Sequence, residues 1–291
     1  MNRQRTPTCP ILGATIGLSL LLSAITGCGK LTSGANSVAT VKYRPAAQVA
    51  AEASAANETA VNAEASENEG GVGTLRGRVV YVGNHIPLSP WFAKGAAAKD
   101  PSVCGLEEIP NESILVKDGG LANTFVYLDK IPKGVAFPIP TEAVLFDQKV
   151  CIFSPHAIIV RVKQTMKILN ADGAAHNTHT YPKKNTAFNS VVQPNDRTGV
   201  DLSYTQSEKE PLSVGCDIHP WMTAYHLPLD HPFAAVSAAD GSFEIKDLPA
   251  GKHEFKVWHE AGKMVEKAFQ VTIKPGDNAV TINVPASKLG Q

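Results

Sequence analysis

The sequence lacks an excess of either charge, since 27 Lys and Arg residues stand against 27 Asp and Glu residues. A chain without net charge has no field to steer it onto a polyanion, which argues against a general DNA- or RNA-binding protein. Aromatic residues are few, at 7%, and 20 prolines are scattered through short apolar runs. Proline ends helices, so long helices are not expected. An all-β fold is the leading class.

A long hydrophobic run is also missing. The run Ile11–Ile25 has 15 residues, fewer than the about 20 that a bilayer of about 30 Å requires. It follows a basic start and ends in small residues, as an export signal does. Ile25-Thr26-Gly27-Cys28 resembles the bacterial lipobox, which implies cleavage before Cys28 and lipidation of its thiol. We expect residues 1–27 to be a lipoprotein signal peptide, with a plain secretory peptide as the alternative.

Large apolar side chains are nearly absent from residues 28–71, which consist mostly of Ala, Glu, Asn, Ser and Thr. Such a segment cannot bury enough surface to fold, so it is expected to be a disordered tether. The protein would then be an exported lipoprotein held on a membrane by its N-terminal lipid, facing the periplasm or the cell surface. Inner and outer membrane both stay open.

Strand patterns begin after the tether. Leu75, Gly77, Val79 and Tyr81 alternate with residues of the other face, and residues 121–129 form a second half-buried pattern. Strands recur about every 8–12 residues with Gly, Pro and Asp-Gly between them, which is typical of a β-sandwich. The further strands are expected at 144–153, 157–162, 166–169, 176–181, 199–204, 212–216, 233–237, 242–245, 253–258, 265–273 and 279–284.

The segment from Ala238 to Trp258 resembles the carboxypeptidase-regulatory-like, prealbumin-type sandwich. Asp240-Gly241 and residues 249–251 are expected to form two successive hairpins. In that family the opening strands look like residues 77–80 and 125–128 of this chain. The resemblance implies that residues 72–134 and 233–291 form one sandwich, interrupted by an inserted domain at 135–232. Two successive sandwiches are the alternative.

The insert contains two segments rich in metal ligands, His176-Asn177-Thr178-His179 and the loop from Cys216 through His219 to Met222. Two imidazoles, one thiolate and a weak axial thioether are the ligand set of a blue-copper site. Cys216 would end a strand, the loop would turn His219 back toward it, and Met222 would begin the return strand. The spacing therefore predicts one type 1 copper ion.

Both segments, over the whole insert, resemble the cupredoxins, of the amicyanin and plastocyanin type, which are Greek-key sandwiches. The resemblance implies that the copper ligands are His176, Cys216, His219 and Met222. It also implies that Asn177 holds the two ligand segments together through its amide. The exposed edge of His219, within an apolar patch that could include Trp221, would be the electron portal.

The ligand loop departs from amicyanin at Ile218, where that family member has proline. A backbone N–H is therefore present at residue 218 and could donate to the Cys216 sulfur. A donor to the thiolate favours Cu(I), so a higher reduction potential is expected than the proline loop would give.

Cysteine is scarce, with five residues in the chain. Cys9 would leave with the signal peptide and Cys28 would carry lipid, which leaves three thiols in an oxidising compartment. We expect Cys104 and Cys151 to form a disulfide that ties the two sandwiches together, with free buried thiols as the alternative. Cys216 remains as the metal ligand.

Five other histidines have weaker claims. His179 is expected to be a strand residue and not a fifth ligand. A second metal site is a further, less favoured reading, because unpatterned histidines in β proteins are usually hydrogen-bonded surface or core residues. Its ligands would come from His156, His226, His231 and His259.

Catalytic motifs are missing: the sequence has no Gly-x-Ser-x-Gly, His-Glu-x-x-His, phosphate-binding glycine loop or Cys-x-x-Cys-His. We therefore expect no enzyme but a membrane-tethered copper protein that carries single electrons between redox proteins. Two alternatives stay open. One is a lipoprotein that sequesters or delivers copper, and the other is a metal-free sandwich that binds proteins or glycans.

Overall fold

A computed structural model describes residues 70–131 and 137–291. All of these residues belong to one compact unit, Ala65–Gln291. The expected signal peptide, Cys28 and the tether up to residue 69 lie outside the described residues. Within the described ranges, no helix is both long enough and apolar enough to cross a membrane.

The fold is all-β, which confirms the predicted class. In the described part of the chain, helix is limited to α2 (Pro101–Cys104) and a 3₁₀ turn, η1 (Ala286–Leu289). The strands are β1 (Val72–Val82), β2 (Val116–Lys117), β3 (Gly120–Leu121), β4 (Phe125–Leu128), β5 (Val144–Lys149), β6 (Ile152–Ser154), β7 (Ala157–Arg161), β8 (Met166–Ile168), β9 (His176–Tyr181), β10 (Asn189–Val192), β11 (Val200–Leu202), β12 (Leu212–Gly215), β13 (Thr223–Leu229), β14 (Ala234–Val236), β15 (Ser242–Pro249), β16 (Gly251–His259), β17 (Lys263–Ile273) and β18 (Gly276–Pro285).

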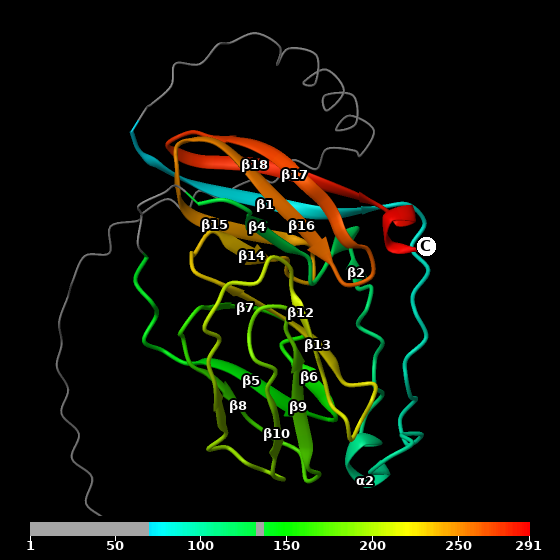
Figure 1. The fold of residues 1–291 in the computed structure, drawn as a ribbon. Coiled ribbons are helices and arrows are strands. Elements are labelled where there is room, and N and C mark those ends of the chain that lie inside the picture. Colours follow the sequence, from blue (N-terminus) through cyan, green and yellow to red (C-terminus); the bar gives the residue numbers. More distant parts are fainter. Residues whose placement is uncertain (1–69, 132–136) are drawn as a thin grey trace, which may run out of the picture. The chain divides into compact units, whose positions relative to one another are not determined.

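Strands from both ends of the described chain share two sheets (Figure 1). One has the order β15-β1-β3-β2, with β18 parallel to β1, and the other has the order β14-β4-β16-β17. Leu75, Val79 and Tyr81 of β1 are buried between them, as the period-two pattern predicts. This first pair of sheets therefore joins segments that lie far apart in the sequence.

Strands β5 to β13 form a second pair of sheets. Their orders are β10-β9-β12-β13-β7 and β11-β8-β5-β6. Both sheets contribute to a single core, for example through Phe146 of β5, Met166 of β8 and Val214 of β12. Because β9 and β12 are hydrogen-bonded neighbours, this sheet brings the two expected ligand segments side by side.

The two predicted hairpins near the C-terminus are wrong. Asp240 and Gly241 do form a tight turn, with Gly241 at φ 82°. However, β14 before this turn pairs with β4, whereas β15 after it pairs with β1. The second turn likewise leads from β15 to β16, which pairs with β4 and β17. At both turns the chain crosses from one sheet to the other, because each sheet must cover one side of the same core.

The expected strand at 144–153 is also wrong in one respect, because it is a hairpin of β5 and β6. Lys149 pairs with Ile152, so Val150 and Cys151 form a two-residue turn. Both have positive φ, 53° and 55°, as a type I′ turn requires. Asp172 accepts hydrogen bonds from the backbone N–H groups of Val150 and Cys151, at 2.6 and 2.8 Å, and so stabilises a turn that contains no glycine.

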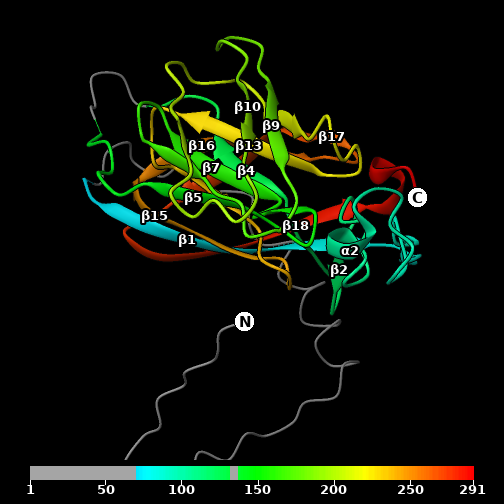
Figure 2. The ribbon, with the colours of Figure 1, turned by 90° about the horizontal axis from the view of Figure 1, so that it is seen from below.

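Residues 84–113, between β1 and β2, form what we call the cap segment. It carries α2, which lies beside the loop that joins β12 and β13 in Figure 1 and is seen from below in Figure 2. The disulfide Cys104–Cys151 is present, as predicted. Cys104, Ala97 and Ile109 of the cap segment pack in the core of the second pair, so the bond links the two pairs of sheets only through the cap segment, which continues into β1 and β2. The disulfide fastens this segment to the β5–β6 turn.

Gly120→Ala tests the close packing of β3. A Cβ at Gly120 would lie 1.8 Å from the carbonyl oxygen of Asp240 and 2.6 Å from the nitrogen of Gly241. Since both atoms belong to the backbone, the turn must move, at a cost of about 1–3 kcal/mol. We expect a lower melting temperature by circular dichroism. Gly70→Ala, which has no atom within 4 Å of the added Cβ, is the control, and equal melting of the two variants would contradict this packing.

Candidate metal centre

Three side chains converge at one end of the second pair of sheets. His176 is the first residue of β9, Cys216 directly follows β12, and His219 lies in the loop after it. The two Nδ1 atoms of His176 and His219 are 2.9 Å apart, and the Cys216 Sγ is 3.9 Å from the His219 Nδ1. Ligand atoms of all three residues lie within 4.8 Å of one another. The structure therefore places these three predicted ligands around one point.

The fourth predicted ligand, Met222, closes the loop. Its backbone N–H donates to the His219 carbonyl at 2.9 Å, and its carbonyl accepts from the Cys216 N–H at 3.3 Å. Met222 lies one residue before β13 and is buried. These two bonds hold the ends of the loop together and fix where Cys216 and His219 lie relative to each other.

A carboxylate binds the outer nitrogen of each histidine. The Nε2 of His176 is 2.8 Å from the Oδ2 of Asp172, and the Nε2 of His219 is 2.9 Å from the Oδ2 of Asp100. A carboxylate accepts a hydrogen bond, so it favours the tautomer that carries the proton on Nε2. The lone pair is then on Nδ1, which faces the other histidine and the thiol. This is the usual arrangement around metal-bound histidines.

Asn177 connects the strand and the ligand loop. Its Oδ1 accepts the backbone N–H groups of Asp217 and Ile218, at 2.7 and 3.3 Å, and the Cys216 thiol at 3.3 Å. Its Nδ2 donates to the carboxylate of Asp217 at 2.8 Å. One buried amide thus binds three consecutive residues of the loop to the beginning of β9.

The expected hydrogen bond from Ile218 to the Cys216 sulfur is wrong. The N–H of Ile218 points to Asn177, and the N–H of His219 donates to the sulfur, at 3.4 Å. The reason is the turn after Cys216, which directs two successive N–H groups onto the Asn177 oxygen before the chain reaches the sulfur. The higher reduction potential was predicted from that hydrogen bond, so the structure does not support it.

The expected exposed edge of His219 is wrong as well. His219 is 0% exposed, because Asp100, the residue before α2, lies over its Nε2. Lys99 of the cap segment also donates to the Ile218 carbonyl at 3.0 Å. The ring of Trp221 packs edge-on against His219, with 5.1 Å between ring centroids. The cap segment and Trp221 together close the side of the site that the sequence predicted to be open.

Hydrogen bonding outweighs burial in setting the charge of the site. Burial alone would raise the pKa of the Cys216 thiol, but His176 and His219 oppose it and lower this pKa to about 6. Burial would likewise lower the pKa of His176, but Asp172 and Cys216 together outweigh burial and raise this pKa to about 9. Cys216 is thus prepared as a thiolate, the form that binds a metal.

The remaining histidines take no part in this centre. His179 lies on β9 and contacts Asp217 at 3.1 Å. In the described part of the chain, none of the four histidines considered for a second site belongs to a group of three side chains with converging ligand atoms. His226 contacts the Tyr204 hydroxyl at 2.8 Å, His231 and His259 accept backbone N–H groups, and His156 lies between two glutamates.

Asp100 and Asp172 are site residues that the sequence analysis missed. Asp172 precedes His176 by four residues, a short spacing that could have suggested it. Asp100 gave no such signal, because 119 residues separate it from His219.

A thiolate and two imidazoles fit copper or zinc among the common metals. Burial of all three ligands and the two outward carboxylates fit a resident ion. The ion would displace the additional proton that His176 holds in the metal-free protein, and the carboxylates would keep the remaining proton of each imidazole on Nε2.

No family model matches the chain, and no curated protein does. Among solved structures, the copper-containing nitrite reductase NirK from Thermus scotoductus SA-01 is 15% identical, with a TM-score of 0.29, over 35% of this chain and 25% of that chain. A purple cupredoxin from Nitrosopumilus maritimus is 16% identical, with a TM-score of 0.25, over 30% of this chain and 99% of its own. A reduced Cu(I) mutant of amicyanin is 18% identical, with a TM-score of 0.27, over 34% of this chain and 97% of its own.

Copper proteins are thus among the solved structures that resemble about a third of the chain. This chain spans only a quarter of the nitrite reductase. Because the TM-scores are low, the case for a metal depends on the side chains of this chain alone.

Alkylation of Cys216 in metal-free protein tests the charge of the site. Only the thiolate reacts, so the rate should fall as the pH drops below about 6 and level off above it. Mass spectrometry of the Cys216 peptide measures the rate. In His176→Gln the midpoint should move up toward the ordinary value of a thiol. A wild-type midpoint near 8.5, that of a free cysteine, would contradict the site.

Proposed function

We propose that this protein is a type 1 copper protein that carries single electrons. The observation that carries the proposal is the convergence of the His176 and His219 Nδ1 atoms with the Cys216 Sγ in a buried site. These residues would hold the ion, with Met222 as a weak fourth ligand. Copper, when bound there, would supply one-electron chemistry through the Cu(II)/Cu(I) pair.

The protein itself would supply a rigid ligand site from which water is excluded. Asp172 and Asp100 fix the two imidazoles from outside, and Asn177 fixes the loop. Electron transfer is fast when ligands move little between oxidation states, and a supported site on strands provides this. The disulfide holds the cap segment, whose Asp100 covers His219.

Burial favours electron transfer over delivery of copper. A delivery protein must release its ion to a partner, whereas His176 and His219 are both 0% exposed. Electrons can cross a protein layer that an ion cannot, so a covered site suits a carrier.

Export and anchoring would decide where the carrier acts. We propose that it is exported as a lipoprotein, is anchored to a membrane through Cys28 and is not an enzyme. Residues 135–232 would form the copper domain, inserted into a carboxypeptidase-regulatory-like sandwich. Its partners would be redox proteins.

Titration of reduced, metal-free protein with Cu(II) tests the function. We expect one ion per chain, an intense visible thiolate-to-copper band, and reversible bleaching by a reductant. Cys216→Ser should abolish the band, because the band needs the sulfur, whereas His179→Gln should keep it. Binding of Cu(I) only, without the band, would instead support sequestration, and no binding would support the metal-free alternative.

Asp172→Asn tests the support of His176. Loss of the charged acceptor weakens the imidazole as a ligand, and such changes typically lower metal affinity by about 10–100-fold. Competition with a chelator measures the affinity for Cu(II). Asp201→Asn, an exposed carboxylate paired with Lys167, is the matched control and should leave it unchanged. Equal affinities for the two variants would contradict the assigned role of Asp172.

A further inference from the structure

A pocket of about 180 Å³ adjoins the ligand loop. Trp221 and Met222 line it, and the ring of Trp221 also packs against His219, with 5.1 Å between centroids. The pocket is therefore separated from a candidate copper ligand by a single aromatic ring.

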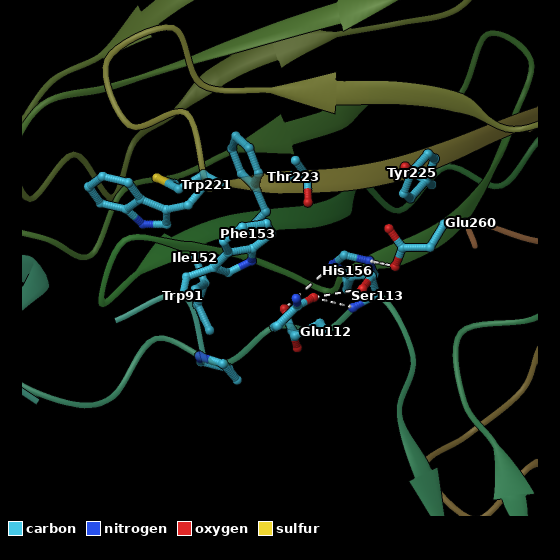
Figure 3. A pocket seen from close by; sticks show the side chains of 13 residues that line it. Trp91, Glu112, Ser113, Ile152, Phe153, His156, Trp221, Thr223, Tyr225 and Glu260 are labelled. Atoms are coloured by element: carbon cyan, nitrogen blue, oxygen red, sulfur yellow. Dashed lines mark hydrogen bonds and ion pairs between the residues drawn. The ribbon is translucent and has the colours of Figure 1, made fainter. Parts of the chain in front are cut away.

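Aromatic side chains form much of its wall. They are Trp91 of the cap segment, Phe153 of β6, Trp221 of the ligand loop and Tyr225 of β13 (Figure 3). Trp91 is 51% exposed, so the pocket reaches the surface. A cavity of about 150 Å³ is known to hold benzene, which makes this pocket large enough for one benzenoid ring.

The polar part of the wall is a histidine between two carboxylates (Figure 3). The His156 Nε2 is 2.5 Å from Glu260 Oε1, and the His156 Nδ1 is 3.5 Å from Glu112 Oε2. The second separation is too long for a hydrogen bond, and the Nδ1 is buried without a hydrogen-bond partner. The His156 side chain is 5% exposed, so an unsatisfied donor is held inside the pocket next to a carboxylate.

The charge of this group selects the ligand. Burial would lower the pKa of His156, but Glu112 and Glu260 outweigh it and raise it to about 9. One imidazolium faces two carboxylates, so the group has a net negative charge. It should reject anions and accept a ligand that donates an O–H group.

We propose that this pocket binds a monocyclic phenol of the hydroquinone type, which is the electron donor of the metal centre. This inference depends on the proposed electron-carrier function and names one of its partners as a small molecule. A redox protein would then be the electron acceptor. The ring would lie among the aromatic side chains, and its hydroxyl would donate to Glu112.

The oxidation of the donor is balanced within the site. The O–H bond of the phenol breaks, and its proton passes to the Glu112 carboxylate. One electron would leave the phenol for a copper ion that His176, Cys216 and His219 would hold, which would change from Cu(II) to Cu(I), and the phenol would depart as a phenoxyl radical. Trp221, in contact with both the pocket and His219, provides the route. This entry replaces the His219 edge that Asp100 covers.

Binding is tested first, on the metal-free protein with hydroquinone as the probe and tryptophan fluorescence or calorimetry as the readout. We expect saturable binding at one site. Glu112→Gln and Trp91→Ala should each weaken it about tenfold or more, the effect of one lost hydrogen bond or aromatic contact. 1,4-Dimethoxybenzene has no O–H to donate, so the wild-type protein should bind it at least as weakly as Glu112→Gln binds hydroquinone.

Two residues of the same cap segment that do not line the pocket provide matched controls. They are Glu107, an exposed partner of Lys94, and Leu106, which is 56% exposed. Glu107→Gln and Leu106→Ala should bind hydroquinone like the wild type. Melting curves of all four variants verify that each is folded.

Electron entry is tested second, by stopped-flow bleaching of the copper band with hydroquinone. The rate should saturate with concentration, and Glu112→Gln should lower the limiting rate about tenfold while Glu107→Gln leaves it unchanged. A rate that rises linearly and is equal in all variants would overturn the donor role. Absence of saturable binding, with the copper band intact, would overturn the pocket alone. Saturable binding to a protein that forms no copper band would overturn the proposed function and leave the phenol site.

Discussion

The structure of the centre depends on the direction in which two imidazoles face. Asp172 and Asp100 each accept a hydrogen bond from a histidine Nε2, at 2.8 and 2.9 Å, and thereby direct both Nδ1 lone pairs inward. The two carboxylates come from different parts of the chain. Asp172 also stabilises the turn that carries Cys151, so ligand orientation, turn conformation and the position of the disulfide are parts of one connected network.

The cap segment decides how the centre communicates with its surroundings. The cap segment is fastened over the ligand loop by the disulfide Cys104–Cys151 and by the contacts of Lys99 and Asp100. This cover leaves His219 fully buried. A covered ligand excludes water and keeps the ion in place, but it also removes the direct contact with a redox partner that an exposed histidine would offer. Trp221 lies at the edge of this cover and borders a pocket, which gives electrons another way in.

The three converging ligands could be predicted because they stand in two short local motifs, one that begins β9 and one in the loop directly after β12. The sequence revealed β9 with its bounds, although burial does not alternate along this strand, because His176, Asn177 and Thr178 are all buried. It did not reveal contacts made over long separations, such as Asp100 with His219, or the turn at Val150 and Cys151, which lacks glycine and is held by Asp172. The hairpins expected near the C-terminus failed for a related reason: turn residues predict a reversal, but not which sheet the next strand joins.

The most direct measurement is the position of copper in crystals of the loaded protein, found from its anomalous scattering. We expect one strong peak bonded to the Nδ1 of His176, the Nδ1 of His219 and the Sγ of Cys216, with both Nε2 atoms still bound to Asp172 and Asp100. A peak elsewhere in the chain, or coordination through either Nε2, would contradict it.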